Sequence, residues 1–306
     1  MKKHFIHLTD FTSDEIWELL YLAKELKIKF NNKEEYKPFR DRSLAMIFAK
    51  PSARTRVSFE TGFEWMGGNA LFLGPNDIGI GKREAIKDIS RLFSGYNDMM
   101  MARLFDHKHI VELAEYSEIP VINGLTDYNH PCQILADILT VWEHRKNLKD
   151  LKVVYLGDGN NIVHSWLQLA CRLPLHFVCC NPLGFDPDDK TVKMVEDSKL
   201  STYEPSHDPK SAVEGADVIY TDVWASMGQK EKADEREKIF ANFQVTIDLL
   251  EKTGKETLFM HCLPAERGRE VTDEVMESKN SIVFDEAENR MHAQNAVMVY
   301  LQKFYS

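Results

Sequence analysis

Short apolar, β-rich runs alternate with helix-sized segments along most of this 306-residue chain. The runs that we predict to be strands are 43–48, 70–73, 98–102, 120–122, 152–156, 176–180, 217–220, 257–261 and 281–284. Between most of them lie segments with a helical pattern, such as 54–66, 85–95, 133–144 and the stretch around 212–215. This alternation is typical of parallel sheets that helices cover on both faces. The sequence therefore predicts an α/β protein.

A charged segment near the middle, residues 143–150, separates two such patterns. After it, Lys152 opens a new apolar run, which we interpret as the first strand of a second domain. The chain is long enough for two medium domains. We predict a first domain over 1–147 and a second over 148–290, each with a mainly parallel sheet flanked by helices. The tail has the pattern of one helix, and we expect 291–306 to return to the first domain.

Composition and charge narrow the classes of function. The 38 basic and 48 acidic residues give a net charge of −10, which makes the chain a poor general partner for nucleic acid or an anionic membrane. No apolar stretch approaches the roughly 18 residues of a membrane span, and the first residues lack the pattern of a signal peptide. The five cysteines form no Cys-x-x-Cys pair and no metal-binding series. We therefore expect free thiols, a cytoplasmic location and no metal.

Uncommon polar residues follow the predicted strands at their carboxyl ends, where ligands bind in open parallel sheets. The segments that contain them begin at Lys50, Arg103, His130, Gly157, Thr221, His261 and Glu288. Because these segments occur in both halves of the sequence, we predict an active site in the cleft between the two domains.

The first of these segments, Ser52-Ala53-Arg54-Thr55-Arg56, opens a predicted helix. The free backbone N–H groups and the positive dipole end of such a helix favour an anion. Two hydroxyls add donors, and Arg54 adds a planar fork that matches phosphate oxygens. A capped surface helix with two solvated arginines is the alternative interpretation of this segment alone.

The segment His130-Pro131-Cys132-Gln133 places a proline at the first position of a predicted helix. His130 and Gln133 are three residues apart, so both can reach one small ligand from the same helix end. We expect a neutral His130, because the helix dipole disfavours the imidazolium, and a neutral ring can donate to a carbonyl. A capping histidine with a structural glutamine is the alternative.

Two further segments leave their interpretation open. Gly157-Asp158-Gly159 follows a strand as in dinucleotide-binding folds, but the third glycine of that fingerprint falls at Ile162, and Asn181 stands at the end of the next strand, where an acid is expected. Cys262 could be a nucleophile, a thiol in contact with a ligand, or a small buried residue.

In their order and spacing, these segments resemble the aspartate/ornithine transcarbamylase family over essentially the whole chain. The series consists of Ser52-Ala53-Arg54-Thr55-Arg56, His130-Pro131-Cys132-Gln133, Asp222 followed by Ser226-Met227-Gly228, His261-Cys262-Leu263-Pro264, and Arg290. The resemblance implies a carbamoyl-phosphate domain in the first half and an ornithine domain in the second. It implies transfer of the carbamoyl group from carbamoyl phosphate to the δ-amine of L-ornithine, giving citrulline and phosphate, without a cofactor or metal.

The resemblance also implies roles for individual residues. Those expected to hold carbamoyl phosphate are Ser52, Ala53 through its backbone, Arg54, Thr55, Arg103, His130, Gln133, Cys262, Leu263 and Arg290. Those expected to hold ornithine are Asn161, Asp222, Ser226 and Met227. Arg103, His130, Asp222 and Cys262 are the candidate catalytic residues. Ala53 stands where many relatives have threonine, a change that a backbone contact tolerates.

The family usually assembles as trimers in which a neighbouring subunit's loop reaches each site. The resemblance therefore implies a homotrimer or a multiple of it, with 78–84 as the loop and Lys82 or Arg83 as the contact. Three alternatives remain: a carbamoyltransferase that uses putrescine, N-acylornithine or aspartate, a nicotinamide-linked oxidoreductase, and a non-catalytic protein on the same fold. The Ser226-Met227-Gly228 segment favours ornithine over the first of these.

Overall fold

The computed structural model describes residues 2–80, 84–225 and 233–305. The chain divides into two compact units, one formed by Met1–Leu139 with Asn289–Ser306 and the other by Thr140–Glu288.

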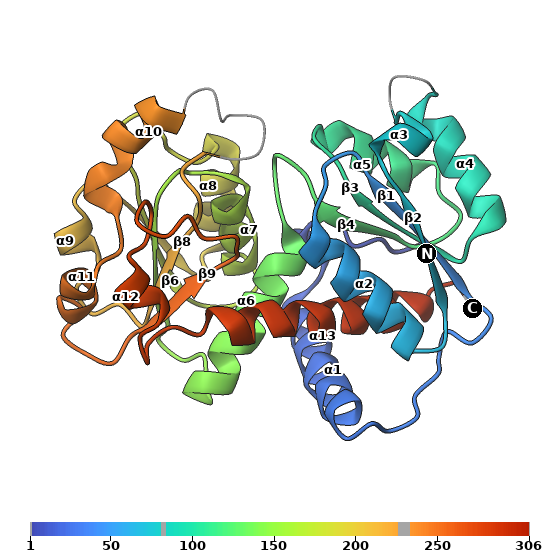
Figure 1. Cartoon of the computed structure of the whole chain (residues 1–306), viewed down its shortest axis with the longest axis horizontal. Helices are drawn as coiled ribbons and strands as arrows, with labels where there is room; N and C mark the ends of the chain where they lie inside the picture. The colour runs from blue at the N-terminus through green and yellow to red at the C-terminus, as the bar shows by residue number, and fades with distance from the viewer. Residues whose placement is uncertain (1, 81–83, 226–232, 306) are drawn as a thin grey trace. The chain divides into compact units, whose positions relative to one another are not determined.

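The first unit is built on a four-stranded parallel sheet in the order β2-β1-β3-β4 (Figure 1). Its strands are β1 (Ser43–Phe48), β2 (Asn69–Leu73), β3 (Met99–Arg103) and β4 (Val121–Leu125). Its helices are η1 (Leu8–Asp10), α1 (Ser13–Asn31), α2 (Ala53–Trp65), α3 (Pro75–Ile78), α4 (Ile86–Tyr96), α5 (His107–Glu115), most of α6 (Pro131–Arg145) and most of α13 (Val283–Gln302).

Helices cover both faces of this sheet. Apolar side chains of β1 and β3 pack against Ile86 and Ile89 of α4 and against Ile110 and Leu113 of α5. Figure 1 shows α2 and α13 on the opposite side of the strands. Every residue of β3 is buried, as expected for a central parallel strand. The buried sheet gives the first unit a rigid frame, and the residues after its strands are held at one edge.

The second unit contains a five-stranded parallel sheet in the order β7-β6-β5-β8-β9. Its strands are β5 (Lys152–Leu156), β6 (His176–Cys180), β7 (Thr202–Ser206), β8 (Val218–Thr221) and β9 (Leu258–His261). Its helices are α7 (Asn161–Ala170), α8 (Asp189–Ser198), α9 (Pro209–Ala212), α10 (Ala233–Phe240), η3 (Ala241–Phe243), α11 (Ile247–Glu251) and α12 (Asp273–Met276).

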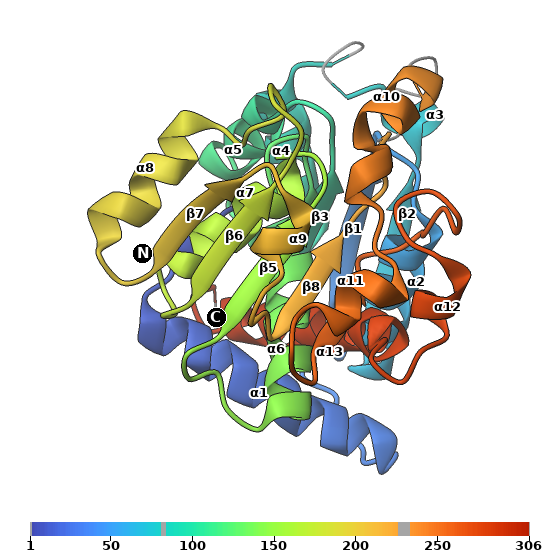
Figure 2. The ribbon, with the colours of Figure 1, turned by 90° about the vertical axis from the view of Figure 1, so that its left-hand side faces the viewer.

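Two cores hold this second sheet between its helices. Val154, Ile219 and Phe259 pack with side chains of α9, α11 and α12 on one face, which is turned toward the viewer in Figure 2. On the other face, Trp166 of α7 stacks on Phe177, with 6.1 Å between the ring centroids. The loops after β5, β8 and β9 leave the sheet at the same edge.

The predicted fold class is confirmed, with differences at two strands. The predicted strand at 281–284 is wrong: Ser281 makes an isolated bridge with Phe259, and α13 begins at Val283. Asp285 and Glu286 in the first turn favour a helix start there. β7 was not predicted from the sequence; it is an edge strand that contains Pro205, a residue tolerated at a sheet edge.

The sequence-based boundary at 147/148 lies between α6 and β5, whereas the division into compact units falls earlier, within α6. The boundary stays a prediction. Among the described residues, we find no helix with the length and hydropathy that crossing a bilayer requires.

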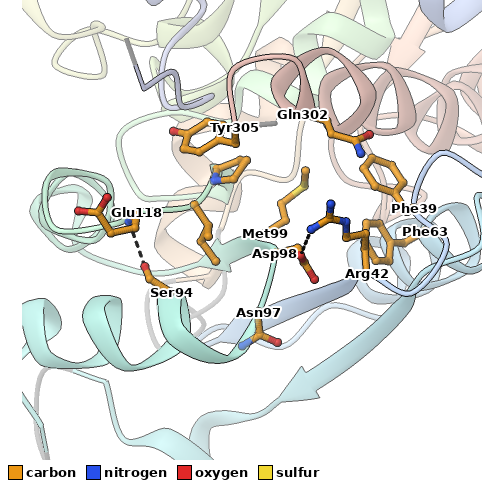
Figure 3. A pocket seen from close by; sticks show the side chains of 12 residues that line it. Phe39, Arg42, Phe63, Ser94, Asn97, Asp98, Met99, Glu118, Gln302 and Tyr305 are labelled. Carbon is orange, nitrogen blue, oxygen red and sulfur yellow. Dashed lines mark hydrogen bonds and ion pairs between the residues drawn. The ribbon is translucent and has the colours of Figure 1, made fainter.

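A cavity of about 300 Å3 lies in the first unit near the starts of β1, β3 and β4. Figure 3 shows the stacked rings of Phe39 and Phe63 beside an ion pair between Arg42 and Asp98, whose closest atoms are 2.6 Å apart. Ligands of open parallel sheets bind at the carboxyl ends of the strands. The active site is therefore expected at the opposite edge of this sheet.

Candidate active site

The start of α2 forms the first part of the site. Ser52 is the N-cap of this helix, and its hydroxyl accepts a hydrogen bond of 3.3 Å from the backbone N–H of Thr55. Ser52 also donates to the hydroxyl of Thr55 at 3.1 Å. Ala53 and Arg54 are exposed in the first turn, where backbone N–H groups have no acceptor within the helix. The structure therefore contains a capped helix start at Ser52, and anion binding there stays a prediction.

Arg103, the last residue of β3, brings a buried guanidinium to this helix start. Its side chain is 7% exposed, and one terminal nitrogen lies 3.5 Å from the hydroxyl of Thr55. The parallel register places Arg103 beside Phe48, the residue that ends β1. Adjacent parallel strands thus bring Arg103 and the segment that contains Ser52 to one edge of the sheet.

Lys50 is a further buried cation at this edge, to which the sequence analysis assigned no role. Its backbone follows β1, its side chain is 8% exposed, and its ammonium lies 2.6 Å from a carboxylate oxygen of Asp127. A lysine directly after a buried strand was the signal that could have identified it.

His130 ends the loop after β4 and directly precedes α6. The side chain is 4% exposed, and its carbonyl accepts a hydrogen bond of 3.0 Å from the N–H of Gln133. Burial, followed by the positive charges of Arg290, Arg103 and Lys50, holds the pKa of His130 well below its usual value near 6.5. The ring is therefore neutral at physiological pH, as expected from the sequence, but burial rather than the helix dipole is the main cause.

Gln133 and Arg290 meet behind this histidine. A terminal nitrogen of Arg290 donates to the amide oxygen of Gln133, and the amide nitrogen of Gln133 donates to Asp137 at 2.7 Å. With its side-chain amide oriented so that the oxygen faces Arg290, Gln294 accepts from two nitrogens of Arg290 at 3.3 and 3.0 Å. Arg290 is thus fixed by neutral oxygens, so its charge is left for an anion.

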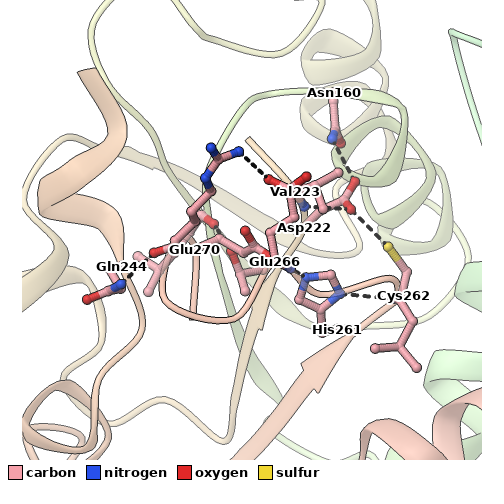
Figure 4. Close-up of polar contacts among 12 residues, drawn as sticks. Asn160, Asp222, Val223, Gln244, His261, Cys262, Glu266 and Glu270 are labelled. Atoms are coloured by element: carbon pink, nitrogen blue, oxygen red, sulfur yellow. Dashed lines mark hydrogen bonds and ion pairs between the residues drawn. The ribbon is translucent and has the colours of Figure 1, made fainter. Parts of the chain in front are cut away.

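The second unit gathers a carboxylate and a thiol at the ends of β8 and β9 (Figure 4). Asp222 accepts from the Sγ–H of Cys262 at 3.2 Å, from the side chain of Asn160 at 3.0 Å, and from the N–H of Val223 at 2.8 Å. Asn160, the N-cap of α7, makes this contact, although the sequence analysis selected its neighbour Asn161, the first residue of the helix. Three donors hold the carboxylate in one orientation.

His261 fixes the backbone that contains Cys262 and Leu263. Its Nδ1 accepts from the N–H of Leu263 at 2.9 Å, so its Nε2 carries the proton that faces Glu270 at 3.1 Å. Both His261 and Glu270 are fully buried. Leu263 has a φ of 56°, an uncommon conformation for a non-glycine residue, and its peptide bond to Pro264 is cis. The loop is therefore shaped by side chains that sequence reasoning did not select, Glu270 among them.

The glycines after β5 serve chain packing. A Cβ at Gly159 would lie 2.4 Å from the backbone nitrogen of Pro187, and the N–H of Gly159 donates to the carbonyl of Phe185 at 2.8 Å. Asp158 forms an ion pair with Arg236. The close approach that requires a glycine is made by the protein's own backbone, and this weakens the nucleotide interpretation.

Asp222, His261 and Cys262 also form a group whose potential ligand atoms lie within 4.8 Å of one another. Both ring nitrogens of His261 already have partners, Leu263 and Glu270. A metal bound here would have to break one of these contacts, so the group fits a metal poorly.

The first unit thus brings together Ser52, Thr55 and Arg103, and also His130, Gln133 and Arg290. The second unit brings together Asp222, Cys262 and Leu263. Ser226 and Met227, predicted to hold ornithine, and Lys82 and Arg83, predicted to contact a neighbouring subunit, lie outside the described residues.

Comparison with known proteins gives consistent matches over both units. Residues 3–143 match the family model of the aspartate/ornithine carbamoyltransferase carbamoyl-P binding domain, and 149–301 match that of the Asp/Orn binding domain. The chloroplastic ornithine carbamoyltransferase of Pisum sativum is 57% identical over 98% of this chain and 80% of its own length.

Two solved structures have the same fold. The ornithine carbamoyltransferase of Pyrococcus furiosus superposes with a TM-score of 0.92 at 48% identity, covering 97% of this chain and 96% of that one. The anabolic ornithine carbamoyltransferase of Campylobacter jejuni gives a TM-score of 0.93 at 35% identity, covering 99% of this chain and 100% of that one.

Proposed function

This chain belongs to the aspartate/ornithine carbamoyltransferase family and transfers the carbamoyl group of carbamoyl phosphate to the δ-amine of L-ornithine, and we propose the residues that perform each step. The first unit holds carbamoyl phosphate. Ser52, the N–H of Ala53, Arg54, Thr55 and Arg103 bind the phosphate, since a capped helix start and convergent guanidinium groups suit a dianion.

His130, Gln133 and Arg290 bind the carbamoyl group. Attack on the carbonyl carbon places negative charge on its oxygen, and this charge needs preorganised donors. Arg103, His130 and the hydroxyl of Thr55 are the donors that we propose. The depressed pKa of His130 supports this role, because a neutral imidazole can stabilise the oxygen through a hydrogen bond without first losing a proton.

The second unit holds ornithine. Asp222, whose carboxylate is oriented by three donors, is the group that we propose to position the δ-amine, with Asn161, Ser226 and Met227 as further contacts. Cys262 and Leu263 complete the carbamoyl contacts. The amine attacks only in its neutral form, and deprotonation at pH 7 costs about 4 to 5 kcal/mol for an amine with a lysine-like pKa. Desolvation and nearby cations lower this cost.

One observation carries the assignment of the first unit: the buried guanidinium groups of Arg103 and Arg290 both lie near His130, and both contact oxygens of neutral side chains, those of Thr55, Gln133 and Gln294. Such a cluster is costly to bury unless an anion compensates it. Carbamoyl phosphate supplies this anion.

The test is citrulline formation from carbamoyl phosphate with L-ornithine, compared with product formation from putrescine, N-acetyl-L-ornithine and L-aspartate. Arg54→Ala should lose most of the ornithine-dependent activity, whereas the control Arg40→Ala, at an exposed arginine of the same unit, should keep it. Turnover with another amine alone would contradict the ornithine assignment. Equal activity of the two variants would contradict the phosphate site.

We also propose a homotrimer, a cytosolic location and the biosynthetic direction. Five free cysteines are typical of a reducing compartment, and the structural relative from Campylobacter jejuni is an anabolic enzyme. Light scattering should give three times the 35.4 kDa mass of one chain, or a multiple of that value. A monomeric mass would contradict the assembly.

A further inference from the structure

The loop that ends at His130 is attached to the amino-terminal segment of the chain. Phe5 lies beside β4, where its N–H donates to the carbonyl of Val121 at 2.9 Å and its carbonyl accepts from Asn123 at 2.8 Å. The side chains of Asn123 and Asn129 both donate to the carbonyl of Ile6, at 3.2 and 3.0 Å. The residue that directly precedes His130 is therefore held by the first residues of the protein.

A pair of histidines forms a second attachment between the same segments. The Nε2 atoms of His7 and His107 lie 2.8 Å apart, and their ring centroids are 4.8 Å apart. The Nδ1 of His7 lies 3.2 Å from a carboxylate oxygen of Asp10, and the Nδ1 of His107 lies 2.8 Å from the hydroxyl of Thr126. The pair thus connects η1, the start of α5 and the loop after β4.

The direction of each hydrogen bond in this series follows from the carboxylate at its end. An ionised carboxylate only accepts, so the Nδ1 of His7 carries a proton and its Nε2 accepts. The Nε2 of His107 must then carry the proton between the rings, and its Nδ1 accepts from the hydroxyl of Thr126. In this neutral state, every ring nitrogen of the pair has a donor or acceptor of the correct kind.

Thr126 connects the pair to the backbone of the His130 loop. Its hydroxyl oxygen accepts from the N–H groups of Tyr128 and Asn129, each at 3.3 Å. A hydroxyl oxygen has two lone pairs, so these two donors use its full capacity. While the hydroxyl proton points to His107, both lone pairs remain available to the loop.

We infer that His7, His107 and Thr126 form a proton-sensitive positioning relay for the loop that presents His130 to carbamoyl phosphate. The inference rests on the proposed function of His130. One added proton reverses the relay. The Nε2 proton of His107 moves to His7, a solvent proton binds the Nδ1 of His107, and the positive charge rests on His7 beside Asp10.

Reversal of the relay weakens the hydrogen bonds between Thr126 and the loop that ends at His130. The Nδ1–H of His107 becomes a third donor to the hydroxyl oxygen of Thr126, where it competes with the N–H groups of Tyr128 and Asn129. The hydroxyl proton turns to the amide oxygen of Asn129, which lies 3.3 Å away and already accepts from Asn123 at 2.6 Å. His130 is then less well placed for carbamoyl phosphate.

The surrounding charges favour one added proton on the histidine pair and oppose a second. Burial, followed by the nearby His7, lowers the pKa of His107 to about 4, while Asp106 and Asp10 act in the opposite direction. Tyr128 packs on His107 with its ring centroid 4.9 Å away. A single added proton therefore leaves one N–H between the two rings, whereas a second would place two N–H groups face to face.

Nitrogen NMR of the intact protein tests the relay without using activity. At pH 8, His107 should be protonated at Nε2, and at acidic pH its proton should move to Nδ1 once the pair has taken up a proton. His7→Gln should abolish this tautomer change, whereas His109→Gln, at a histidine two residues further along α5, should leave it intact. Protonation of His107 at Nδ1 already at pH 8 would overturn the inference.

Kinetics test the coupling to the site. At acidic pH, kcat/KM for carbamoyl phosphate of the wild type should fall by about 3- to 10-fold more than that of His7→Gln or His107→Gln, because the variants lack the proton-dependent step. His109→Gln should follow the wild type. Identical pH profiles for all four proteins would overturn the coupling. A complete lack of carbamoyl transfer by the wild type, with the tautomer change present, would instead contradict the proposed function.

Discussion

The two units share an architecture but present opposite chemistry at the same edge of their sheets. In the first unit, the residues that follow the strands are cations and a neutral histidine: Lys50, Arg103 and His130. In the second, the residues after β8 and β9 are a carboxylate and a thiol, Asp222 and Cys262. A parallel sheet with helices on both faces thus supplies a rigid edge, and a few loop residues decide which charge that edge binds.

The difference corresponds to the two substrates. Carbamoyl phosphate is an anion, and the first unit has a helix start and guanidinium groups for it. The δ-amine of ornithine is cationic in water, and Asp222 suits that charge. The two units therefore differ in the charge that they present to a substrate, and single substitutions in either unit can test this difference.

The largest effect is expected for Arg103→Lys. The charge remains, but the planar fork next to Thr55 is lost, and kcat should fall by about 10²- to 10³-fold. Steady-state assays of citrulline formation measure this, with Arg91→Lys, at an exposed arginine of α4, as the control. A kcat within about threefold of the wild type would mean that positive charge alone suffices at this position.

The corresponding change in the second unit, Asp222→Asn, should act on the other substrate. It removes the charge but keeps the shape, and KM for ornithine should rise by about 10-fold to 100-fold while KM for carbamoyl phosphate changes little. Asp197→Asn, at an exposed position of α8, is the matched control. An equal rise in both KM values would contradict the assignment of one substrate to each unit.

Ala53 allows a finer test of the first unit, because its proposed contact with the phosphate is made by its backbone N–H. Ala53→Pro removes only the N–H at the first helical position, where proline is tolerated, and it should raise KM for carbamoyl phosphate by about tenfold. Ala53→Thr keeps the N–H and should leave KM nearly unchanged. Titration of each variant with carbamoyl phosphate gives the two KM values. A larger effect of threonine than of proline would indicate a side-chain role.

The smallest expected effect is on stability. The pKa of His130 is lower in the folded than in the unfolded state, so its contribution is fully present above about pH 6.5 and is lost as the pH falls toward the folded-state pKa. One such group gives a slope of about 1.4 kcal/mol per pH unit. Hydrogen exchange of β3 should accelerate between pH 6.5 and 5 after correction for intrinsic rates, and less so in His130→Gln. Equal slopes in the two proteins would contradict the assignment.

Much of the fold could be predicted from the sequence because the central strands are buried on both faces and therefore stand out as apolar runs. The predicted strands at 43–48, 152–156 and 176–180 coincide with β1, β5 and β6. β7 could not be recognised, because this edge strand is largely exposed, is mostly polar and contains Pro205. The run at 281–284 shows the opposite failure, since Ile282 and Val283 are buried by a helix start while Phe284 is 63% exposed.

The candidate site was predictable where a residue directly follows a strand, as Arg103 does. The site was less predictable where a contact joins side chains that are separated in the sequence. Glu270 meets His261 only through the folding of the loop between them, and Arg290 reaches Gln133 from a helix near the end of the chain. Pattern and spacing contain no information on such pairs.

Because the first unit is formed by Met1–Leu139 together with Asn289–Ser306, the order of synthesis matters for it. On the ribosome, Gln133 emerges long before Arg290, and the whole of the second unit is translated in between. Until α13 has left the exit tunnel, the nascent first unit lacks one of its buried cations and the apolar side chains of that helix. We expect chaperones to meet this unit as a complete sheet that lacks the cover of α13, and premature termination shortly before residue 289 to leave a chain that degradation removes.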